Sequence, residues 1–295
     1  MAAHTLRTLE AQHLDAFLRV DARACGLSQH EVRSRSFVAA IIKLHPALAL
    51  GAWAGESLVG AVIGMALGTV GAVLHCCVDP DHQRQGVGTQ LMTELIRTLT
   101  QRVGVCIVQL PSAASWEIAW LSQMGFYCTE PQIVMRKSVS ECPHVADRKE
   151  PFHSQWSDHL GLADAGPEME HEQLGRLVPI GGTGQYAGML FLETSARRQA
   201  SASSSTAISF GNVMRTLSCD CLVGALARAQ EITFNCGRRQ IVLAINSVYG
   251  RELEALLKGG WSIVRTCHRM VQKRSLVRYR QVQAQPQVDL SHWSL

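Results

Sequence analysis

Two glycines separated by one residue lie in the segment Gln83-Arg84-Gln85-Gly86-Val87-Gly88, directly before a stretch with helical apolar spacing. Glycine lets backbone amides turn inward because no Cβ atom is in the way, and a helix start adds N–H groups and a partial positive charge. A loop of this kind, extended through Thr89, can bind a phosphate or a pyrophosphate through its amides. An ordinary strand-to-helix turn without a ligand is the alternative.

The residues on either side predict a strand, the loop and a helix, in that order. Residues 72–78 form an apolar run that contains one imidazole and two thiols, and Asp79-Pro80-Asp81 is a turn signal. Residues 89–99 then place apolar side chains at helical spacing. The sequence therefore brings several chemically active side chains close to the loop.

Most of the first 140 residues follow one pattern of strands and helices. The long apolar stretch over 48–78 has Glu56 as its only charge, but glycine turns divide it, so three antiparallel strands explain it better than a membrane-spanning helix. In chain order we expect a strand and a helix over 5–25, a helix from Ser28 to Leu44, strands over 47–54, 58–67 and 70–78, the helix after the loop, a strand over 103–110, a helix from Ser112 or Ser115 through Leu121, and a last strand pair over 127–139.

This order of elements resembles the GCN5-related N-acetyltransferase (GNAT) superfamily over residues 5–139. The motif of that family, Gln/Arg-x-x-Gly-x-Gly/Ala, is present as residues 83–88 after Val78-Asp79-Pro80, and Met124-Gly125-Phe126 resembles the family's second cofactor-side element. The resemblance implies an α/β (α+β) fold in which a mixed, mostly antiparallel sheet is flanked by helices.

The resemblance also implies a co-substrate, acetyl-CoA or a related acyl-CoA. In such proteins the loop amides hold the pyrophosphate, and the strand before the loop offers main-chain groups to the pantetheine arm, which binds like an extra strand. The cofactor-binding residues implied in this chain are Cys76, Cys77, Val78, Gln83, Arg84, Gln85, Gly86, Val87, Gly88 and Thr89.

The catalytic groups common in the family are missing at two positions. A tyrosine that protonates the leaving group is commonly found where this chain has Leu121, and a general base is often found where it has Ala72. His75 is the candidate catalytic base. Strict strand alternation points it away from the face of Ala72, and only the bulge that the resemblance leads us to expect in this strand would bring it round. A packed or surface histidine, a water chain, or an amine that is already deprotonated are the alternatives.

The function that these observations predict is N-acetyl transfer from acetyl-CoA to an amine, preferably a small molecule, by direct transfer in a ternary complex. No residue marks a covalent intermediate, and Cys76 is the thiol to examine for one. A non-catalytic acyl-CoA-binding regulatory protein and a protein or peptide N-acetyltransferase are the alternatives. The sequence sets neither the identity of the amine nor the oligomeric state.

The second half of the chain repeats the order of the first. We expect an N-terminal GNAT domain over 1–140, a polar linker over 141–175, a degenerate GNAT-like domain over 176–280 and a tail over 281–295. Where the phosphate loop should recur, the second domain has no Gly-x-Gly, and Asp220 would repel phosphate, so we expect no CoA binding there. This domain either lines the acceptor site or only stabilises the fold.

Length and composition fit two ordinary globular domains, with 295 residues, 47% apolar and 18% charged residues, and a net charge of +4. The basic residues over 265–280 are interpreted as a solvated last strand and tail rather than a nucleic-acid contact. Ten cysteines include no Cys-x-x-Cys pair, so no metal site is predicted. Without a signal peptide or a transmembrane segment, we expect an intracellular, cytoplasmic protein with no membrane partner.

Overall fold

The structure is a computed structural model that describes residues 4–26, 34–140, 175–182, 185–193, 205–214, 218–283 and 287–289. The described residues form two compact units, the first up to Val108 and the second from Gln109. None of the described helices is long and apolar enough to cross a membrane.

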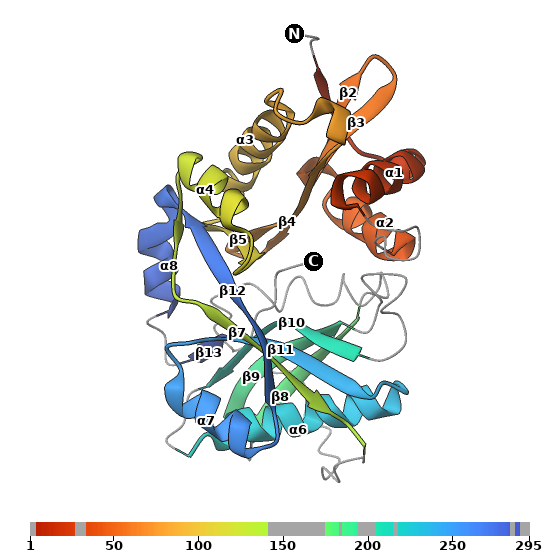
Figure 1. Ribbon diagram of the computed structural model, residues 1–295. Helices are drawn as coiled ribbons and strands as arrows, with labels where there is room; N and C mark the ends of the chain where they lie inside the picture. The colour runs from red at the N-terminus through yellow and green to blue at the C-terminus, as the bar shows by residue number, and fades with distance from the viewer. Residues whose placement is uncertain are drawn as a thin grey trace. The chain divides into compact units, whose positions relative to one another are not determined.

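The first unit is built on a sheet of neighbouring strands in the order β1-β2-β3-β4-β5 (Figure 1). The long apolar stretch forms strands, as expected, and its turns contain Gly55 and Gly68, whose φ angles of 61° and 53° favour glycine. All neighbours in this sheet are antiparallel except β4 and β5, which are parallel. Its strands are β1 (Thr5–Thr8), β2 (Ala49–Ala54), β3 (Ser57–Leu67), β4 (Val70–Val78) and β5 (Val105–Pro111), the last of which continues into the second unit.

Helices cover both faces of this sheet, with α1 (Leu14–Cys25) and α2 (Arg35–Leu44) on one side and α3 (Val87–Thr100) on the other (Figure 1). Glycines on the strands let α3 approach closely, since a Cβ atom at Gly71 would lie 2.8 Å from Leu99 Cδ2. The helix expected from Ser28 is α2, and its N-cap is Ser34, whose hydroxyl accepts from the Phe37 amide. Ser28 lies outside the described residues.

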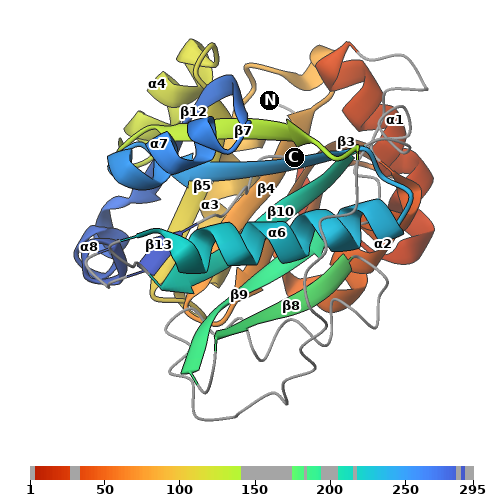
Figure 2. The same ribbon diagram turned by 90° about the horizontal axis from the view of Figure 1, so that it is seen from below.

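In the second unit, α6 (Asp220–Asn235) packs against β8, β9 and β10, as Figure 2 shows. The buried core on this side includes Leu226, Ile241 and Leu243, which are fully or almost fully covered. The other elements of this unit are α4 (Ser115–Gln123), β6 (Phe126–Cys128), β7 (Gln132–Ser138), β8 (Gly175–Gly182), β9 (Gln185–Glu193), β10 (Ser205–Met214), β11 (Gln240–Asn246), α7 (Gly250–Lys258), β12 (Ser262–Gln272), α8 (Leu276–Gln283) and β13 (Gln287–Asp289).

The strand pair expected over 127–139 does not form a hairpin. Instead, β6 pairs with β12, and β7 lies between β11 and β12, antiparallel to both. Strands from the first half of the chain thus pair with strands from the second half. The expected linker and the serine-rich stretch before Ser205 lie outside the described residues.

The basic residues near the C-terminus do not form a uniformly solvated tail. Arg269 lies on β12 and is only 1% exposed, and its neighbours Met270 and Val271 are buried with it. Residues 276–283 form the helix α8. The interpretation of this whole segment as a solvated strand and tail is therefore wrong at Arg269.

Candidate functional site

The candidate site of the first unit begins where β4 and β5 diverge. Their parallel ladder pairs Val70 with Val105 and ends at Val73 and Val108, whereas β4 stays paired with β3 as far as Val78. The change coincides with a bulge, because Ile63 pairs with His75 while the next residue, Gly64, pairs with Val73. Leu74 is thus the extra residue of β4. We call the main-chain side of Leu74–Val78 that faces away from β3 the β4 edge.

The bulge decides which way His75 points. Gly71 faces α3, so alternation places Ala72 on the opposite face, toward α1. The extra residue at Leu74 reverses the alternation, and His75 therefore lies on the α1 face as well. The structure thus contains a bulge that turns His75 to the face of Ala72, as its candidate role as a base requires.

Asp21 of α1 lies directly against His75. The distance from Asp21 Oδ1 to His75 Nε2 is 2.7 Å, and the aspartate side chain is completely buried. The ring of Phe17, also on α1, meets the imidazole edge-on with 6.1 Å between centroids. A buried carboxylate needs a charged or hydrogen-bonding neighbour, and here it fixes the position of the imidazole.

Sequence reasoning missed Asp21, although a signal was present. Leu14, Phe17 and Val20 form the buried face of α1, and Asp21 is four residues after Phe17, so it falls on the same face. An acidic residue within an apolar helix face is the kind of exception that marks a specific partner. The identity of that partner, His75, comes only from the fold.

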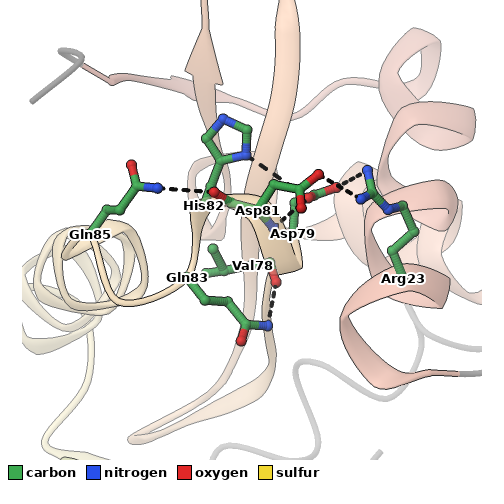
Figure 3. Close-up of polar contacts among 7 residues, drawn as sticks. All are labelled: Arg23, Val78, Asp79, Asp81, His82, Gln83 and Gln85. Carbon is green, nitrogen blue, oxygen red and sulfur yellow. Dashed lines mark hydrogen bonds and ion pairs between the residues drawn. The ribbon is translucent and has the colours of Figure 1, made fainter.

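The turn before the glycine loop is held by α1. Arg23 forms ion pairs with Asp79 and Asp81, each at 2.8 Å, as Figure 3 shows. The hydrogen bond that Arg23 donates to Asp81 and the charge of Asp79 raise the pKa of Arg23. Because Arg23 compensates the two carboxylates, they oppose a bound anion at the neighbouring loop less than isolated acids would.

Two glutamine side chains brace the loop itself. Gln83 Nε2 donates to the Val78 carbonyl at 3.0 Å, and Gln85 Nε2 donates to the Asp81 carbonyl at 2.9 Å (Figure 3). The Gln83 amide donates to the Pro80 carbonyl at 3.3 Å. Gln83 therefore uses both its side chain and its backbone to close the end of β4 onto the loop.

The loop has the left-handed backbone that turns amides inward. Arg84 and Gly86 have φ angles of 61° and 84°, and this conformation costs a non-glycine residue such as Arg84 about 1 kcal/mol. The helix α3 begins at Val87 after Gly86 as N-cap, and the first bond of this helix runs from the Gln90 amide to Gly86. Its first-turn amides, those of Val87 and Gly88 among them, thus point toward the loop. We call residues 83–89 the glycine loop.

The two cysteines of the β4 edge are poor nucleophiles. Burial raises the pKa of Cys76 to about 12, so the thiol is protonated at neutral pH. Cys77 is buried. A protonated thiol does not attack a thioester, which favours direct transfer over a covalent intermediate.

The helix α4 contains the position where the family commonly has a tyrosine. Leu121 occupies it and is only 2% exposed. The hydroxyl of the next residue, Ser122, donates to the Ile118 carbonyl at 2.8 Å, and Trp120 packs near Trp116 with 6.1 Å between centroids. Among these residues of α4, the structure shows no replacement for the tyrosine hydroxyl.

Comparison with known proteins agrees with the fold. Residues 15–126 match the family model of the Acetyltransferase (GNAT) family. No curated protein matches the sequence. Similar solved structures include an acetyltransferase-like protein from Pyrococcus horikoshii (13% identity, TM-score 0.63, 99% of this chain and 96% of that one), a tandem GNAT protein from the clavulanic acid biosynthesis pathway (12%, 0.61, 92% and 99%), and a GCN5-related N-acetyltransferase from Sphaerobacter thermophilus (14%, 0.57, 92% and 96%).

Residues 15–126 therefore have a sequence of the GNAT family, whose members use a CoA thioester and an acceptor. The solved structures cover nearly the whole chain, so the fold of the chain is that of GNAT proteins, tandem members included. At these low identities the structural similarity shows the fold alone.

Proposed function

We propose that this protein is an acyl-CoA-dependent N-acetyltransferase that moves an acetyl group from acetyl-CoA to an amine by direct transfer in a ternary complex. One observation supports the donor most strongly. The glycine loop, with left-handed Arg84 and Gly86, follows a strand that diverges from its parallel neighbour, within the residues that match the GNAT family model. The loop amides of residues 83–89 would bind the pyrophosphate, and the β4 edge would bind the pantetheine arm.

His75 is the proposed general base, and Asp21 is its positioning residue. An amine must lose a proton as it attacks the thioester carbonyl, and an imidazole near neutral pH is suited to accept that proton. Asp21, 2.7 Å from Nε2, orients the ring and stabilises the imidazolium that forms. The proton finally leaves with bulk water, while the CoA thiolate is protonated by water, since α4 offers no tyrosine at Leu121.

The acceptor is proposed to be a small-molecule amine. We further propose that the chain consists of GNAT-type domains over 1–140 and 176–280, joined by a linker over 141–175 and followed by a tail over 281–295. In this proposal only the first domain binds CoA, and the second domain either lines the acceptor site or stabilises the fold. A peptide N-terminus or lysine side chain is the alternative acceptor.

A non-catalytic, acyl-CoA-binding regulatory protein is the second candidate function. The buried Leu121 and the alanine at position 72 favour it, because both replace polar groups that catalysis commonly uses in the family. The two candidates share the same CoA site. They differ only in whether an amine receives the acetyl group.

Calorimetry with acetyl-CoA, followed by thiol release over a panel of amines, separates the candidates. We expect binding of one acetyl-CoA per chain and turnover with at least one small amine. Binding without turnover on any small amine or peptide would favour the regulatory protein, and no binding would contradict both.

The variant Gly86→Ala tests the loop, because Gly86 has a φ of 84° and open space around the position of a Cβ atom. The substitution acts through backbone conformation alone, and we expect acetyl-CoA affinity to fall about tenfold or more, since a strained backbone costs of order 1–2 kcal/mol. Gly237→Ala is the matched control, as Gly237 has a φ of 69° and equally open surroundings in the second unit. It should lower stability similarly and leave affinity unchanged.

A further inference from the structure

Three side chains that bind transition metals come together where α1 meets the bulge of β4. Asp21 and Cys25 are four residues apart on α1 and share one face of that helix, and His75 faces them from β4. A ligand atom of each lies within 4.8 Å of the other two. Asp21 Oδ1 is 2.7 Å from His75 Nε2 and accepts a hydrogen bond from Cys25 Sγ at 3.6 Å.

We propose that Asp21, Cys25 and His75 bind a divalent transition-metal ion of the zinc type, and that the bound ion inhibits acyl transfer. Thiolate, imidazole and carboxylate are the ligands that Zn²⁺ prefers, and three of them with one water complete a tetrahedral site. Ligand atoms in such a site lie about 3–4 Å apart, given metal–ligand bonds of about 2.0–2.3 Å. The observed spacing requires side-chain shifts of only about 1 Å to reach this geometry.

The surroundings favour a cation and give it a way in. Asp21 places a carboxylate in a buried position, where a positive charge is strongly favoured. Cys25 is exposed and is the last residue of α1, at the helix end that has a partial negative charge. The nearby cation Arg23 is directed away, toward Asp79 and Asp81.

Binding exchanges protons for the metal ion without any change of oxidation state. The Cys25 thiol releases its proton to solvent as the sulfur–metal bond forms, and His75 binds as the neutral imidazole through Nε2. The bound ion would lie between Asp21 and His75 and would replace their direct contact. A His75 ring held by a metal ion is no longer a base for an amine. This inhibitory effect rests on the proposed function, whereas metal binding does not.

The binding test uses the full chain after removal of metals by a chelator, with Co²⁺ as the spectroscopic probe. A cobalt–thiolate charge-transfer band is expected for the wild-type protein. Cys25→Ser and Cys25→Ala should lose the band and weaken Zn²⁺ binding, measured by calorimetry, at least about tenfold. Cys128→Ser is the matched control, because Cys128 is also exposed and lies outside any such cluster in the described part of the chain. Absence of the band in the wild type, or its persistence in both Cys25 variants, would overturn the site.

The inhibition test compares acetyl transfer with and without Zn²⁺. The Cys25→Ser variant should keep the rate of the metal-free wild type and lose its sensitivity to Zn²⁺, because Cys25 takes no part in the transfer. Equal inhibition of wild type and variant would overturn the inhibitory role. A cobalt band that depends on Cys25 in a protein that acetylates no amine would support the metal site while contradicting the proposed enzyme.

Discussion

The segment β4–α3–β5 of the first unit and the segment β10–α6–β11 of the second share one backbone plan with different contents. Each has a short parallel ladder, from Val70–Val73 to Val105–Val108 and from Ser205–Ala207 to Gln240–Val242. Each first strand then has a bulge with one extra residue, Leu74 in β4 and Ser209 in β10. The same strand–helix–strand frame therefore occurs twice in this chain.

The contents differ at the positions where chemistry would occur. The residue after the bulge is His75 in β4 and Phe210 in β10. Each helix follows a left-handed residue, Gly86 before α3 and Cys219 before α6. However, α6 has Asp220 in its first turn, where Ser218 donates to the carboxylate at 2.5 Å. Asp220 therefore compensates the partial positive charge at the start of α6. The first turn of α3 has no acid, so its positive end is available to an anion.

The strand edges differ in the same sense. In the second unit, β13 pairs antiparallel with Asn212–Met214, on the edge of β10 opposite to β9 and a few residues beyond the bulge. The corresponding residues of the first unit belong to the β4 edge. In the second unit, β13 thus occupies the strand edge that corresponds to the proposed site of the pantetheine arm. Asp220 occupies the helix start that corresponds to the proposed site of the pyrophosphate. The difference teaches that the shared frame sets where a ligand can bind and the local residues decide whether one does.

The largest expected effect comes from removing the imidazole that distinguishes β4 from β10. His75→Gln should lower kcat at least about a hundredfold, because general-base catalysis contributes about 10²–10⁴ in rate. Acetyl-CoA affinity by calorimetry should stay unchanged, since the β4 edge binds through main-chain groups. Asp21→Asn should lower kcat less and shift the pH profile of kcat. An unchanged kcat in His75→Gln would mean that no side-chain base is used.

A charge at the start of α3 sharpens the comparison of the two helix ends. Gly88→Asp should weaken acetyl-CoA binding about tenfold or more, since it places a carboxylate near the proposed site of the pyrophosphate. This carboxylate in the first turn of α3 would correspond to Asp220 in the first turn of α6. Gly88→Asn has the same size without the charge and is the control. If both variants bind equally, size rather than charge at this position decides affinity. Calorimetry at low and high salt would separate the two, because salt screens only the charge.

The sequence predicted the parts of the site that are local in the chain. The loop of residues 83–89 and its helix depend on neighbouring residues, so glycine spacing and apolar periodicity were enough. The antiparallel arrangement of β2, β3 and β4 was also predicted, because hairpin turns join these consecutive strands. Gly55 and Gly68 both lie in turns between the strands that were expected over 47–54, 58–67 and 70–78.

Features that depend on distant residues were not predicted. The pairing of Asp21 with His75 requires α1 to pack on β4. A bulge in β4 was expected, but its position at Leu74 leaves no mark in the residue pattern. The place of β7 between β11 and β12 was missed because strand partners far apart in sequence are set by tertiary packing, whereas periodicity only indicates that a strand forms. Correct element types thus coexist with a wrong pairing.

The smallest expected effect concerns β13, the strand that occupies the edge of β10. Val288 pairs with Val213, and Val288→Pro removes a backbone donor from this ladder. Losing one ladder hydrogen bond costs about 1 kcal/mol, so amide hydrogen exchange at 212–214 should become several-fold faster. Val288→Ala keeps the donor and is the control. Acetyl-CoA should still bind once per chain, because Asp220 remains at the start of α6. A second bound acetyl-CoA in Val288→Pro would show that β13 alone, and not the charge at the helix start, keeps the second frame from binding the cofactor.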